Sequence, residues 1–419
     1  MGFVQNLVWM NTEKIRQDFP FLKQKIDGKP VIYFDNAATT LKPRKVIDAI
    51  TGYYENYSVN VHRAFYRLGE RATMEYDEAH EKTAKFIGGE KKEEIVFTKN
   101  TTESINLVIN SLVGSGMINK GDEVLTTIME HHSSILPCLM LKKKGFTVNV
   151  AEINDNYEID LNDFQEKLSK KTKFVSFAMA SNTIGTINPV EKIIKMIRDV
   201  SPEAFIMLDG AQGVPHEPVN VKKLDCDFLA FSPHKMLGPT GLGVLYGKLE
   251  HFEKMNPFLL GGGMIAKVTL DEIKFAPPFE KFEAGTPPIA QAIGFSAAMD
   301  YLNEIGMDKI RNYEKELTKE MLKAFEGVNS IKLRCPKDAD KQAPVFLFSM
   351  DKVHPHDIAA LLDEMNAICV RAGLHCAEPL LRRLSEEGFA RASLYIYNTK
   401  DEIKVFGETI REIEKMFEK

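Results

Sequence analysis

The sequence is poor in cysteine, and its thiols follow no paired spacing. Five of the 419 residues are cysteine and none of them forms a C-x-x-C motif. An odd and scattered set argues against a disulfide framework and against a structural zinc site, so we expect no metal. The thiols are expected to be reduced, with all but Cys376 serving as small core side chains: Cys138, Cys226, Cys335 and Cys369.

The sequence also lacks long apolar runs and an excess of charge of one sign. No apolar run reaches the roughly 18 residues of a membrane span, and the opening residues 1–10 lack the basic start and cleavage site of a secretory signal. The net charge of −5 is spread without large blocks, which gives no indication of binding to nucleic acid or to an anionic membrane. We expect a cytoplasmic protein. A charged helical pattern begins after Met10, which makes Met10 an alternative start and leaves residues 1–9 unassigned.

The remaining composition is that of a globular protein with 44% hydrophobic and 27% charged residues, long enough for two or three domains. Short, almost continuously apolar runs alternate with helical stretches between residues 90 and 250. Such runs are typical of buried parallel strands, and their alternation with helices predicts an α/β sheet covered on both faces. The expected strands are 93–98, 122–128, 173–180, 204–208 and 227–231, with a further strand after the Gly/Pro-rich turn at 236–241.

The pattern changes after GGGM (261–264) and the proline-rich segment 276–288. One long helical stretch covers about 290–325, and strands near 344–350 and 368–371 then mix with helices. We therefore predict a large domain over 30–290 and a smaller α+β domain over 291–419, with residues 11–29, including a helix over 11–20, packed against the smaller one.

Two charged residues follow expected strands directly. Asp209 ends the run FIML, and Lys235 lies just past DFLAF in SPHK. Ligands gather at the carboxyl ends of strands in open α/β sheets, although a turn or cap aspartate and a solvated lysine would look the same. Ser232 and His234 flank the lysine, and nearby glycines permit close backbone approach. A lysine that bonds covalently to a carbonyl group needs such a crowded setting to lower its pKa.

Two further segments follow strands. Thr101 and Thr102 open a helix, where free N–H groups and the helix dipole favour a phosphate, although a plain threonine cap fits equally. His131 and His132 follow the strand 122–128 without the further ligands that a metal site would need. An imidazole packed over a flat ring, or a solvated loop histidine, is the better interpretation.

Six motifs occur together in the order NTTE, MEHH, DGAQ, SPHK, EAGTP and RAGLHC. This ordered set resembles the class V aminotransferase group of fold-type I pyridoxal-phosphate enzymes, and within it the Suf-type (group II) cysteine desulfurases. The resemblance extends from about residue 12 to the C-terminus. It implies a large domain with a mostly parallel, mixed sheet flanked by helices, and a smaller C-terminal α+β domain.

The resemblance also implies pyridoxal 5′-phosphate as the cofactor. Lys235 matches the lysine that holds it covalently, and Asp209 matches the acid that keeps its pyridine nitrogen protonated. His131 matches the histidine that stacks on the ring, and Gln212 matches the residue that bonds the phenolic oxygen. Thr102, Ser232 and His234 match the residues that hold the phosphate, and Thr101 would extend that group.

The same resemblance implies how an amino-acid substrate is held. Arg391 matches the arginine that clamps the substrate carboxylate, a task suited to a bidentate guanidinium. Asn182 matches a residue near the same carboxylate, and Arg371 lines the entrance. Thr286 in EAGTP matches a phosphate contact from the neighbouring subunit, which implies a homodimer.

Cys376, 15 residues before Arg391, matches the nucleophile of the family. The implied reaction converts L-cysteine to L-alanine and leaves a persulfide on Cys376. The sulfur then passes to an acceptor protein or scaffold for iron–sulfur cluster or related biosynthesis. Because only the thiolate is nucleophilic, the surroundings should be electropositive, with Arg371 and His375 supplying charge.

The motifs depart from the family pattern at three places. Pro233 stands where glycine is usual, Ala372 and Leu374 stand where threonine and histidine are common, and GGGMI (261–265) lacks an extra residue after the third glycine. None of these departures removes a residue with a direct chemical role.

Other functions are compatible with the same fold. A selenocysteine lyase or a cysteine-sulfinate desulfinase would keep the cofactor and change the substrate. Another class V aminotransferase, lyase or epimerase would not depend on Cys376, and a non-catalytic relative would not bind the cofactor. Neither the sulfur acceptor nor the order of the Cys376 loop follows from the sequence.

Overall fold

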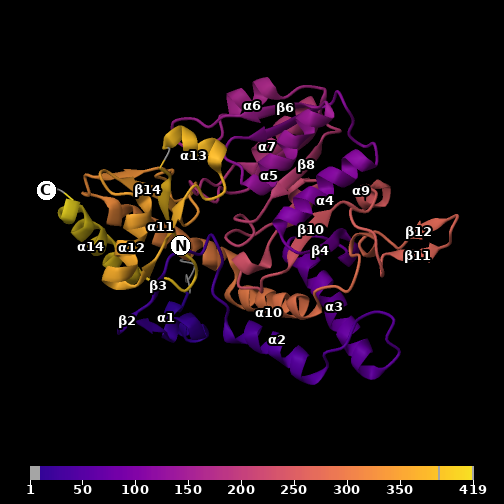
Figure 1. The fold of residues 1–419 in the computed structure, drawn as a ribbon, viewed down its shortest axis with the longest axis horizontal. Helices are drawn as coiled ribbons and strands as arrows, with labels where there is room; N and C mark the ends of the chain where they lie inside the picture. Colours follow the sequence, from indigo (N-terminus) through magenta and orange to yellow (C-terminus); the bar gives the residue numbers. More distant parts are fainter. Residues whose placement is uncertain (1–9, 386, 418–419) are drawn as a thin grey trace, which may run out of the picture.

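The computed structural model describes residues 10–385 and 387–417, so the question about residues 1–9 lies outside it. The chain forms two adjoining parts (Figure 1). A large α/β part contains the main sheet, and a smaller part contains the C-terminal helices and a second sheet. Among the residues described, no helix is both long and apolar enough to cross a membrane.

The main sheet has seven strands in the order β4-β10-β9-β8-β7-β5-β6. Neighbouring strands from β9 to β6 run parallel, whereas β10 is antiparallel to both β9 and β4. The predicted mixed, mostly parallel sheet is therefore confirmed. The strands are β4 (Ile95–Thr98), β5 (Glu123–Thr127), β6 (Thr147–Ala151), β7 (Thr172–Ala178), β8 (Phe205–Asp209), β9 (Phe228–Phe231) and β10 (Gly243–Gly247).

The sequence patterns did not predict β6. It lies at the edge of the sheet, where the exposed Thr147 and the half-buried Asn149 interrupt the apolar run. An edge strand needs less apolar surface than a central one, so its pattern resembles that of a loop.

Helices cover both faces of this sheet, as expected. Successive strand residues alternate between two cores, as Ile206 and Met207 do on β8. One core is completed by α3, α7 and α10 and the other by α4, α5 and α9. The helices of this part are α2 (Arg44–Asn56), α3 (Arg67–Phe86), α4 (Thr101–Gly114), α5 (His132–Leu141), α6 (Leu161–Lys167), α7 (Val190–Val200), α8 (Val221–Leu224), α9 (Leu249–Lys254) and α10 (Ile289–Ile305).

The helical stretch predicted over 290–325 consists of two helices. α10 ends at Gly306, which has a φ of +94°, and α11 (Met307–Phe325) begins directly after it. The left-handed region of φ is open to glycine at little cost, so a sharp change of direction is possible there. α10 packs against α2 and α3, whereas α11 packs against α14 (Lys400–Phe417).

The smaller part is built around a four-stranded antiparallel sheet in the order β13-β14-β17-β16. Its strands are β13 (Ile331–Leu333), β14 (Val345–Met350), β16 (Arg371–Gly373) and β17 (Phe389–Ser393). Its helices are α11, α12 (Pro355–Asn366), α13 (Glu378–Leu384) and α14. A separate apolar core joins this sheet to α11, α12 and α14.

The N-terminal segment contacts this smaller part. α1 (Thr12–Gln17) is shorter than the predicted 11–20, since Pro20 opens a 3₁₀ helix (Pro20–Lys23). Arg16 forms a 2.8 Å ion pair with Glu402 on α14. β3 (Ile32–Tyr33) pairs in parallel with β15 (Ile368–Cys369), so the start of the chain is bonded to its C-terminal part. The short strands β1 (Lys25–Ile26) and β2 (Lys29–Pro30) form a hairpin between them.

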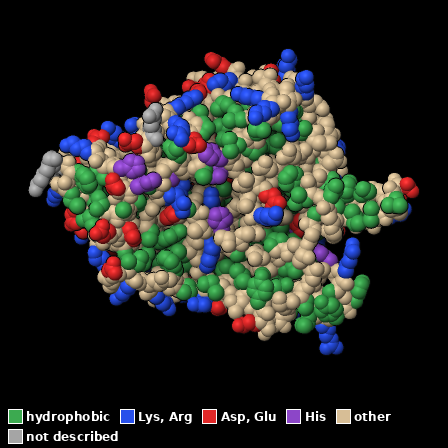
Figure 2. Space-filling view, in the orientation of Figure 1, with side chains coloured by type: hydrophobic (Ala, Val, Ile, Leu, Met, Phe, Trp, Pro, Cys, Tyr) green, Lys and Arg blue, Asp and Glu red, His purple; other side chains and the backbone are tan. Residues whose placement is uncertain are grey.

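A two-stranded hairpin projects from the large part, at the right of Figure 1. It consists of β11 (Ile265–Val268) and β12 (Ile273–Phe275). Its apolar side chains face solvent, with Val268, Leu270 and Ile273 all exposed, and they stand out in the space-filling view (Figure 2).

Candidate active site

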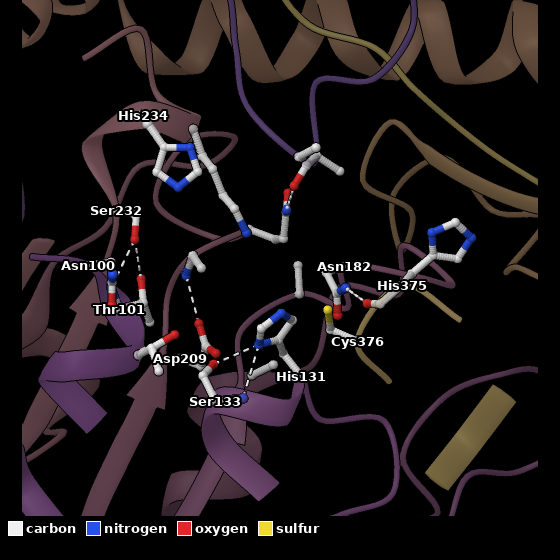
Figure 3. A pocket seen from close by; sticks show the side chains of 18 of the residues that line it. Asn100, Thr101, His131, Ser133, Asn182, Asp209, Ser232, His234, His375 and Cys376 are labelled. Atoms are coloured by element: carbon white, nitrogen blue, oxygen red, sulfur yellow. Dashed lines mark hydrogen bonds between the residues drawn. The ribbon is translucent and has the colours of Figure 1, made fainter. Parts of the chain in front are cut away.

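A pocket of about 530 Å³ opens where the two parts meet, at the carboxyl ends of the main strands. Every residue that the sequence nominated lines it, with the exception of Thr286. In Figure 3, Thr101 and Ser232 lie on one side of the pocket and Asn182, His375 and Cys376 on the opposite side, with His131 between them.

Lys235 and Asp209 reach the pocket from neighbouring strands. Lys235 ends a short 3₁₀ helix (Pro233–Lys235) after β9, and Asp209 is the last residue of β8. Burial lowers the pKa of Lys235 to about 8, although the Asp209 carboxylate opposes this and Arg391 adds to it. Burial raises the pKa of Asp209, against the Ala211 amide that donates to its Oδ1 at 2.9 Å. The lysine therefore has the lowered pKa that covalent chemistry with a carbonyl requires.

One end of the pocket is built to hold an anion. α4 begins there, with the Asn100 side chain capping it by accepting from the Glu103 amide at 2.9 Å. Ser232 joins this helix start to the lysine loop, because its Oγ lies 2.6 Å from Thr101 Oγ1 and accepts from the Thr101 amide at 2.9 Å. Thr102 is exposed in the same wall. Hydroxyls and a helix N-terminus at one place form a typical phosphate site.

His131 is a neutral imidazole at the start of α5. Its Nδ1 accepts from the Ser133 amide at 3.1 Å and lies 2.7 Å from the Ser133 hydroxyl. An acceptor nitrogen carries no proton. Burial is the main reason that the pKa of His131 is lowered to about 3, and the nearby positive charge of Lys235 lowers it further. His234 is neutral for the same reasons, with its pKa lowered to about 3. Neither ring repels the lysine, and a neutral His131 can pack against a flat group.

Gln212 and Asn182 are held by the surrounding backbone. Gln212 is buried and donates to the Ala37 carbonyl at 2.8 Å, while its Oε1 has no partner among the described residues. Asn182 donates to the His375 carbonyl at 2.8 Å, and its own carbonyl accepts from Arg391 at 2.8 Å. Asn182 therefore links the guanidinium to the Cys376 loop.

Arg391 and Arg371 approach the pocket from adjacent strands, β17 and β16. Arg391 is almost completely buried, and burial lowers its pKa to about 10, still far above neutrality. Its Nε has no partner among the described residues. Arg371 is half exposed and forms a bidentate contact with Asp35, of which the shortest distance is 2.8 Å. Two permanent positive charges therefore mark this end of the pocket.

Cys376 is exposed, whereas Cys138, Cys226 and Cys335 are buried. Cys369, which was expected in the core, is only half buried on β15. Cys376 and His375 both adopt left-handed backbone conformations, with φ of +57° and +46°. A left-handed pair of non-glycine residues is uncommon, and such strain is often found at functional sites.

The expectation that His375 adds positive charge near the thiol is wrong. Its Nε2 lies 3.0 Å from the Phe389 carbonyl and therefore acts as a donor. Burial lowers the pKa of His375 to about 3, so the ring is neutral. The positive charges that line the pocket with Cys376 belong to Arg371, Arg391 and Lys235.

Thr286 does not line this pocket. It is exposed between β12 and α10 and borders a second pocket with Phe258, Glu283 and Pro287. This placement leaves Thr286 free to contact another subunit, as the resemblance implies, although no partner chain is described.

The three departures from the family pattern are accommodated locally. Pro233 opens the 3₁₀ helix that carries Lys235, a position whose N–H has no helical partner in any case. Ala372 lines the pocket from β16, and Leu374 packs against the main core. In the glycine loop, the Gly262 carbonyl accepts from the Gly285 amide at 2.8 Å, which fixes the loop against EAGTP.

Two residues that support the site were not found from the sequence. Asp35 contacts both arginines, and its only sequence signal is its position after the run VIYF. The ammonium group of Lys42 donates to the His234 carbonyl at 2.9 Å, and burial lowers its pKa to about 7. Lysines are usually solvated, so nothing in the sequence marks this one.

The donor set fits pyridoxal phosphate. Hydroxyls and helix N–H groups suit a phosphate, and the buried Asp209 carboxylate suits a protonated ring nitrogen. Gln212 is buried in the pocket wall, and its Oε1 has no hydrogen-bond partner among the described residues. Buried polar atoms are usually hydrogen-bonded, so this oxygen is available to bond a ligand in the pocket.

Comparisons with known proteins agree with this geometry. The family model described as aminotransferase class-V matches residues 32–406. A probable cysteine desulfurase of Streptomyces coelicolor is 42% identical, with 97% of this chain and 98% of the relative covered. The apo structure of a cysteine desulfurase from Thermococcus onnurineus NA1 superposes with a TM-score of 0.91 at 41% identity, covering 97% and 98% of the two chains. The cysteine desulfurase CsdA from Escherichia coli gives 0.88 at 33% identity, covering 97% and 99%.

The fold and site define a fold-type I pyridoxal-phosphate enzyme. This chain belongs to the class V aminotransferase family, since the family model spans most of its length and the relatives match it from end to end. The lining of the pocket fits pyridoxal 5′-phosphate, the cofactor of enzymes with this fold.

Proposed function

We propose that this chain is a cysteine desulfurase that converts L-cysteine to L-alanine and receives the sulfur on Cys376. The observation that carries the proposal is the exposed thiol of Cys376 in the same pocket as Lys235 and two arginines. The relatives named above are cysteine desulfurases and match the whole chain, which supports the same activity here.

The arginines orient the amino acid. Arg391 lies almost fully buried with an unpartnered Nε, so it can bond a substrate carboxylate without losing its hold on Asn182. Charge-assisted bonds of this kind are stronger than neutral ones. The carboxylate end is thereby fixed, and the side-chain sulfur is left to face the Cys376 loop.

Lys235 moves the proton at the substrate α-carbon. Burial lowers the pKa of its Nζ to about 8, so roughly a tenth of the amine is uncharged at pH 7 and can accept that proton, far more than for an ordinary lysine. When bound, pyridoxal phosphate supplies an electron-withdrawing ring that stabilises negative charge at the α-carbon. The Asp209 carboxylate would balance the positive charge of the protonated ring nitrogen.

Cys376 takes the sulfur. Its thiolate Sγ forms a bond with the substrate sulfur while the carbon–sulfur bond breaks, and the electron pair of that bond stays with the carbon that becomes the methyl group of alanine. Arg371 and Arg391 line the same pocket as Cys376 and place positive charge in it. A left-handed, exposed loop residue can then present the persulfide to a sulfur acceptor, a protein or scaffold of iron–sulfur cluster or related biosynthesis.

We further propose a homodimer in which Thr286 contacts the cofactor phosphate of the neighbouring subunit. Thr286 is exposed and does not line the pocket of its own chain, which supports this. The division into two domains also stays a prediction. The packing of α10 on α2 and α3, and of α11 on α14, favours a boundary at Gly306 rather than near 290.

The test is production of alanine and sulfide from L-cysteine with a thiol reductant, comparing wild type with Cys376→Ser and Cys369→Ser. Cys376→Ser should lose activity by at least about 100-fold while the visible absorbance of the cofactor persists. Cys369→Ser removes a half-buried thiol outside the pocket and should keep activity. Equal activity of wild type and Cys376→Ser, or none in wild type, would overturn the proposal in favour of selenocysteine, cysteine sulfinate or transamination chemistry.

A further inference from the structure

The carbonyl oxygen of His234, directly before Lys235, accepts hydrogen bonds from four donors. All four come from one short stretch of chain, residues 39–42. The Thr40 amide lies 3.0 Å away, the Thr39 and Thr40 hydroxyls lie 3.0 and 3.1 Å away, and Lys42 Nζ lies 2.9 Å away. A carbonyl oxygen has two lone pairs, so this number of donors exceeds what the oxygen needs to be satisfied.

The 39–42 segment also holds the chain on the other side of Lys235. The Leu237 amide donates to the Thr40 hydroxyl at 2.9 Å. Leu237 is fully buried and has a φ of +66°, an uncommon left-handed conformation for a bulky residue. Strain of this kind persists only where the surrounding structure enforces it. The segment therefore bonds the turn 234–237 both before and after the lysine.

The 39–42 segment is connected in turn to the smaller part. The Ala37 amide, two residues before the segment, donates to the Ser393 hydroxyl at 2.9 Å. Ser393 is buried at the end of β17, the strand that carries Arg391. The turn around Lys235 is therefore held from the side of the substrate arginine and not only by its own strand, β9.

Lys42 brings a positive charge to this contact. Its ammonium group donates to the Thr40 carbonyl at 2.6 Å as well as to the His234 carbonyl, and among the residues that the structure describes it pairs with no acid. Shielding a cation from water without a partner acid costs free energy. Its bonds to carbonyl oxygens are charge-assisted and stronger than those from hydroxyls. The ammonium is therefore placed to hold backbone and not to complete an ion pair.

We infer that Lys42 is a positioning residue, which together with Thr39 and Thr40 holds the turn 234–237 and so fixes where Lys235 presents its amine. Lys42 does not line the pocket, so it acts through the backbone and is not a catalytic residue. The inference deepens the proposed function and rests on it, because the amine that is fixed is the one that moves the substrate proton. A displacement of about 1 Å at such a group can lower a rate by about 100-fold.

The first measurement is amide hydrogen exchange at Leu237 in the holoenzyme at pH 6. Burial lowers the pKa of Lys42 to about 7, so its ammonium is charged at that pH. Lys42→Met keeps an unbranched chain and removes the charge and the donors. Exchange at Leu237 should become about tenfold faster, the factor for one lost hydrogen bond to a charged group.

Lys281→Met is the matched control. Lys281 is buried, donates to the Phe252 and Glu253 carbonyls and does not line the pocket, so the variant should leave exchange at Leu237 unchanged. Equal acceleration in both variants would show a general loss of stability and would overturn the inference.

The Thr40 hydroxyl can be tested in the same way. Thr40→Val removes the hydroxyl that bonds both His234 and Leu237, so exchange at Leu237 should again become faster. Thr40→Ser keeps that hydroxyl and should match wild type. Equal exchange in the valine and serine variants would contradict a turn held by the 39–42 segment.

The second measurement is the steady-state turnover of cysteine. Lys42→Met should lower kcat by at least about tenfold, because the amine is displaced from the substrate α-carbon. KM should stay unchanged, because Arg391 and Asn182 are left in place. A raised KM with an unchanged kcat would overturn the inference.

Reconstitution separates this inference from the proposed function. Apoprotein mixed with pyridoxal phosphate should regain visible absorbance about tenfold more slowly in Lys42→Met, because bonding needs the Lys235 amine in place whatever the substrate is. Slow reconstitution of the variant, with no sulfide released from cysteine by wild type, would contradict the proposed function alone. Normal reconstitution and normal exchange in the variant, with sulfide released by wild type, would overturn the role of Lys42 alone.

Discussion

The backbone amide of His132 donates a 2.7 Å hydrogen bond to the carbonyl oxygen of Cys376. His132 is the first residue of α5, whose opening N–H groups lack partners within the helix. The bond therefore satisfies the helix start and fixes the loop at the nucleophile. A second contact, from the Glu378 amide to His132 Nε2 at 3.2 Å, holds the loop just beyond it.

The side chain of Asn182 is a third tether, through the His375 carbonyl. Asn182→Ala removes this bond and leaves the backbone contact with Arg391 in place. Loss of one buried hydrogen bond costs about 1 kcal/mol, so Cys376 should be alkylated by iodoacetamide about fivefold faster as the loop opens more often. The control is Asn162→Ala, an exposed position on α6, which should match wild type. An unchanged rate in Asn182→Ala would show that the other contacts alone hold the loop.

The same reagent should distinguish the thiols of the folded protein. Burial raises the pKa of Cys226 and of Cys335 to about 12, and it also raises the pKa of Cys138. Few thiolates are then present at neutral pH, and access is blocked, so Cys376 should be modified first. Peptide mass spectrometry after one equivalent of reagent checks this. Comparable labelling of any buried cysteine before denaturation would contradict it.

The lowered pKa of Lys235 predicts how the apoprotein binds its cofactor. Only the uncharged amine bonds to the cofactor aldehyde, and burial lowers the pKa of Lys235 to about 8. The amine is protonated below that pH, so the rate of reconstitution should rise with pH and level off above about pH 8. An ordinary lysine would level off only above about pH 10.

The measurement is the growth of visible absorbance after adding pyridoxal phosphate to apoprotein over a pH series. Lys235→Ala is the control and should show none of the pH-dependent signal. A half-maximal rate near pH 10 in wild type would show that Lys235 is not in the dry setting that the structure describes.

The predicted strands between residues 93 and 231 appear at their predicted places because buried central strands leave a strong apolar signal. Ile206, Met207 and Leu208 on β8 are all fully buried, one after another. The edge strand β6 leaves no such signal. The break at Gly306 was missed because apolar residues continue on both sides of it, and a single glycine does not distinguish a turn from a helix interior.

The candidate site could be nominated from the sequence because its residues lie in short motifs directly after strands. Residues that act on other side chains leave no motif of their own. Asp35 and Lys42 are joined to the site only by contacts across large sequence separations, with Asp35 and Arg391 being 356 residues apart. The charge of His375 was misjudged for a related reason, since its burial depends on the β17 backbone and not on its neighbours in the chain.

The EAGTP segment is anchored by a buried carboxylate. Glu283 accepts from the Tyr76 hydroxyl at 2.6 Å and the Phe97 amide at 2.6 Å, and lies 2.9 Å from His80 Nε2. Glu283→Ala leaves these buried groups unpaired, which should lower the free energy of unfolding by about 3 kcal/mol. Denaturant titration measures this, with Glu272→Ala on the exposed hairpin as a control that should change it by less than about 0.5 kcal/mol. Similar values for both variants would contradict the anchoring role.

The turn that carries Asn182 depends on Gly185. Its φ is +70°, and a Cβ there would lie 2.4 Å from the Val345 carbonyl oxygen and 2.3 Å from the Gln342 side chain. Gly327 offers a matched control, with a φ of +74° and no atom within 4 Å of the added carbon. Both alanine variants incur the cost of a left-handed backbone, about 1 kcal/mol, and only Gly185→Ala adds a clash with a backbone carbonyl.

Gly185→Ala should therefore lower the free energy of unfolding by about 2 kcal/mol more than Gly327→Ala, measured by denaturant titration. It should also lower kcat/KM for cysteine, because the turn that it displaces positions Asn182 against Arg391 and the Cys376 loop. Gly327→Ala lies after α11, away from the pocket, and should leave kcat/KM unchanged. Equal stabilities would mean that β14 moves to accept the methyl group, and the loss of activity should then disappear as well.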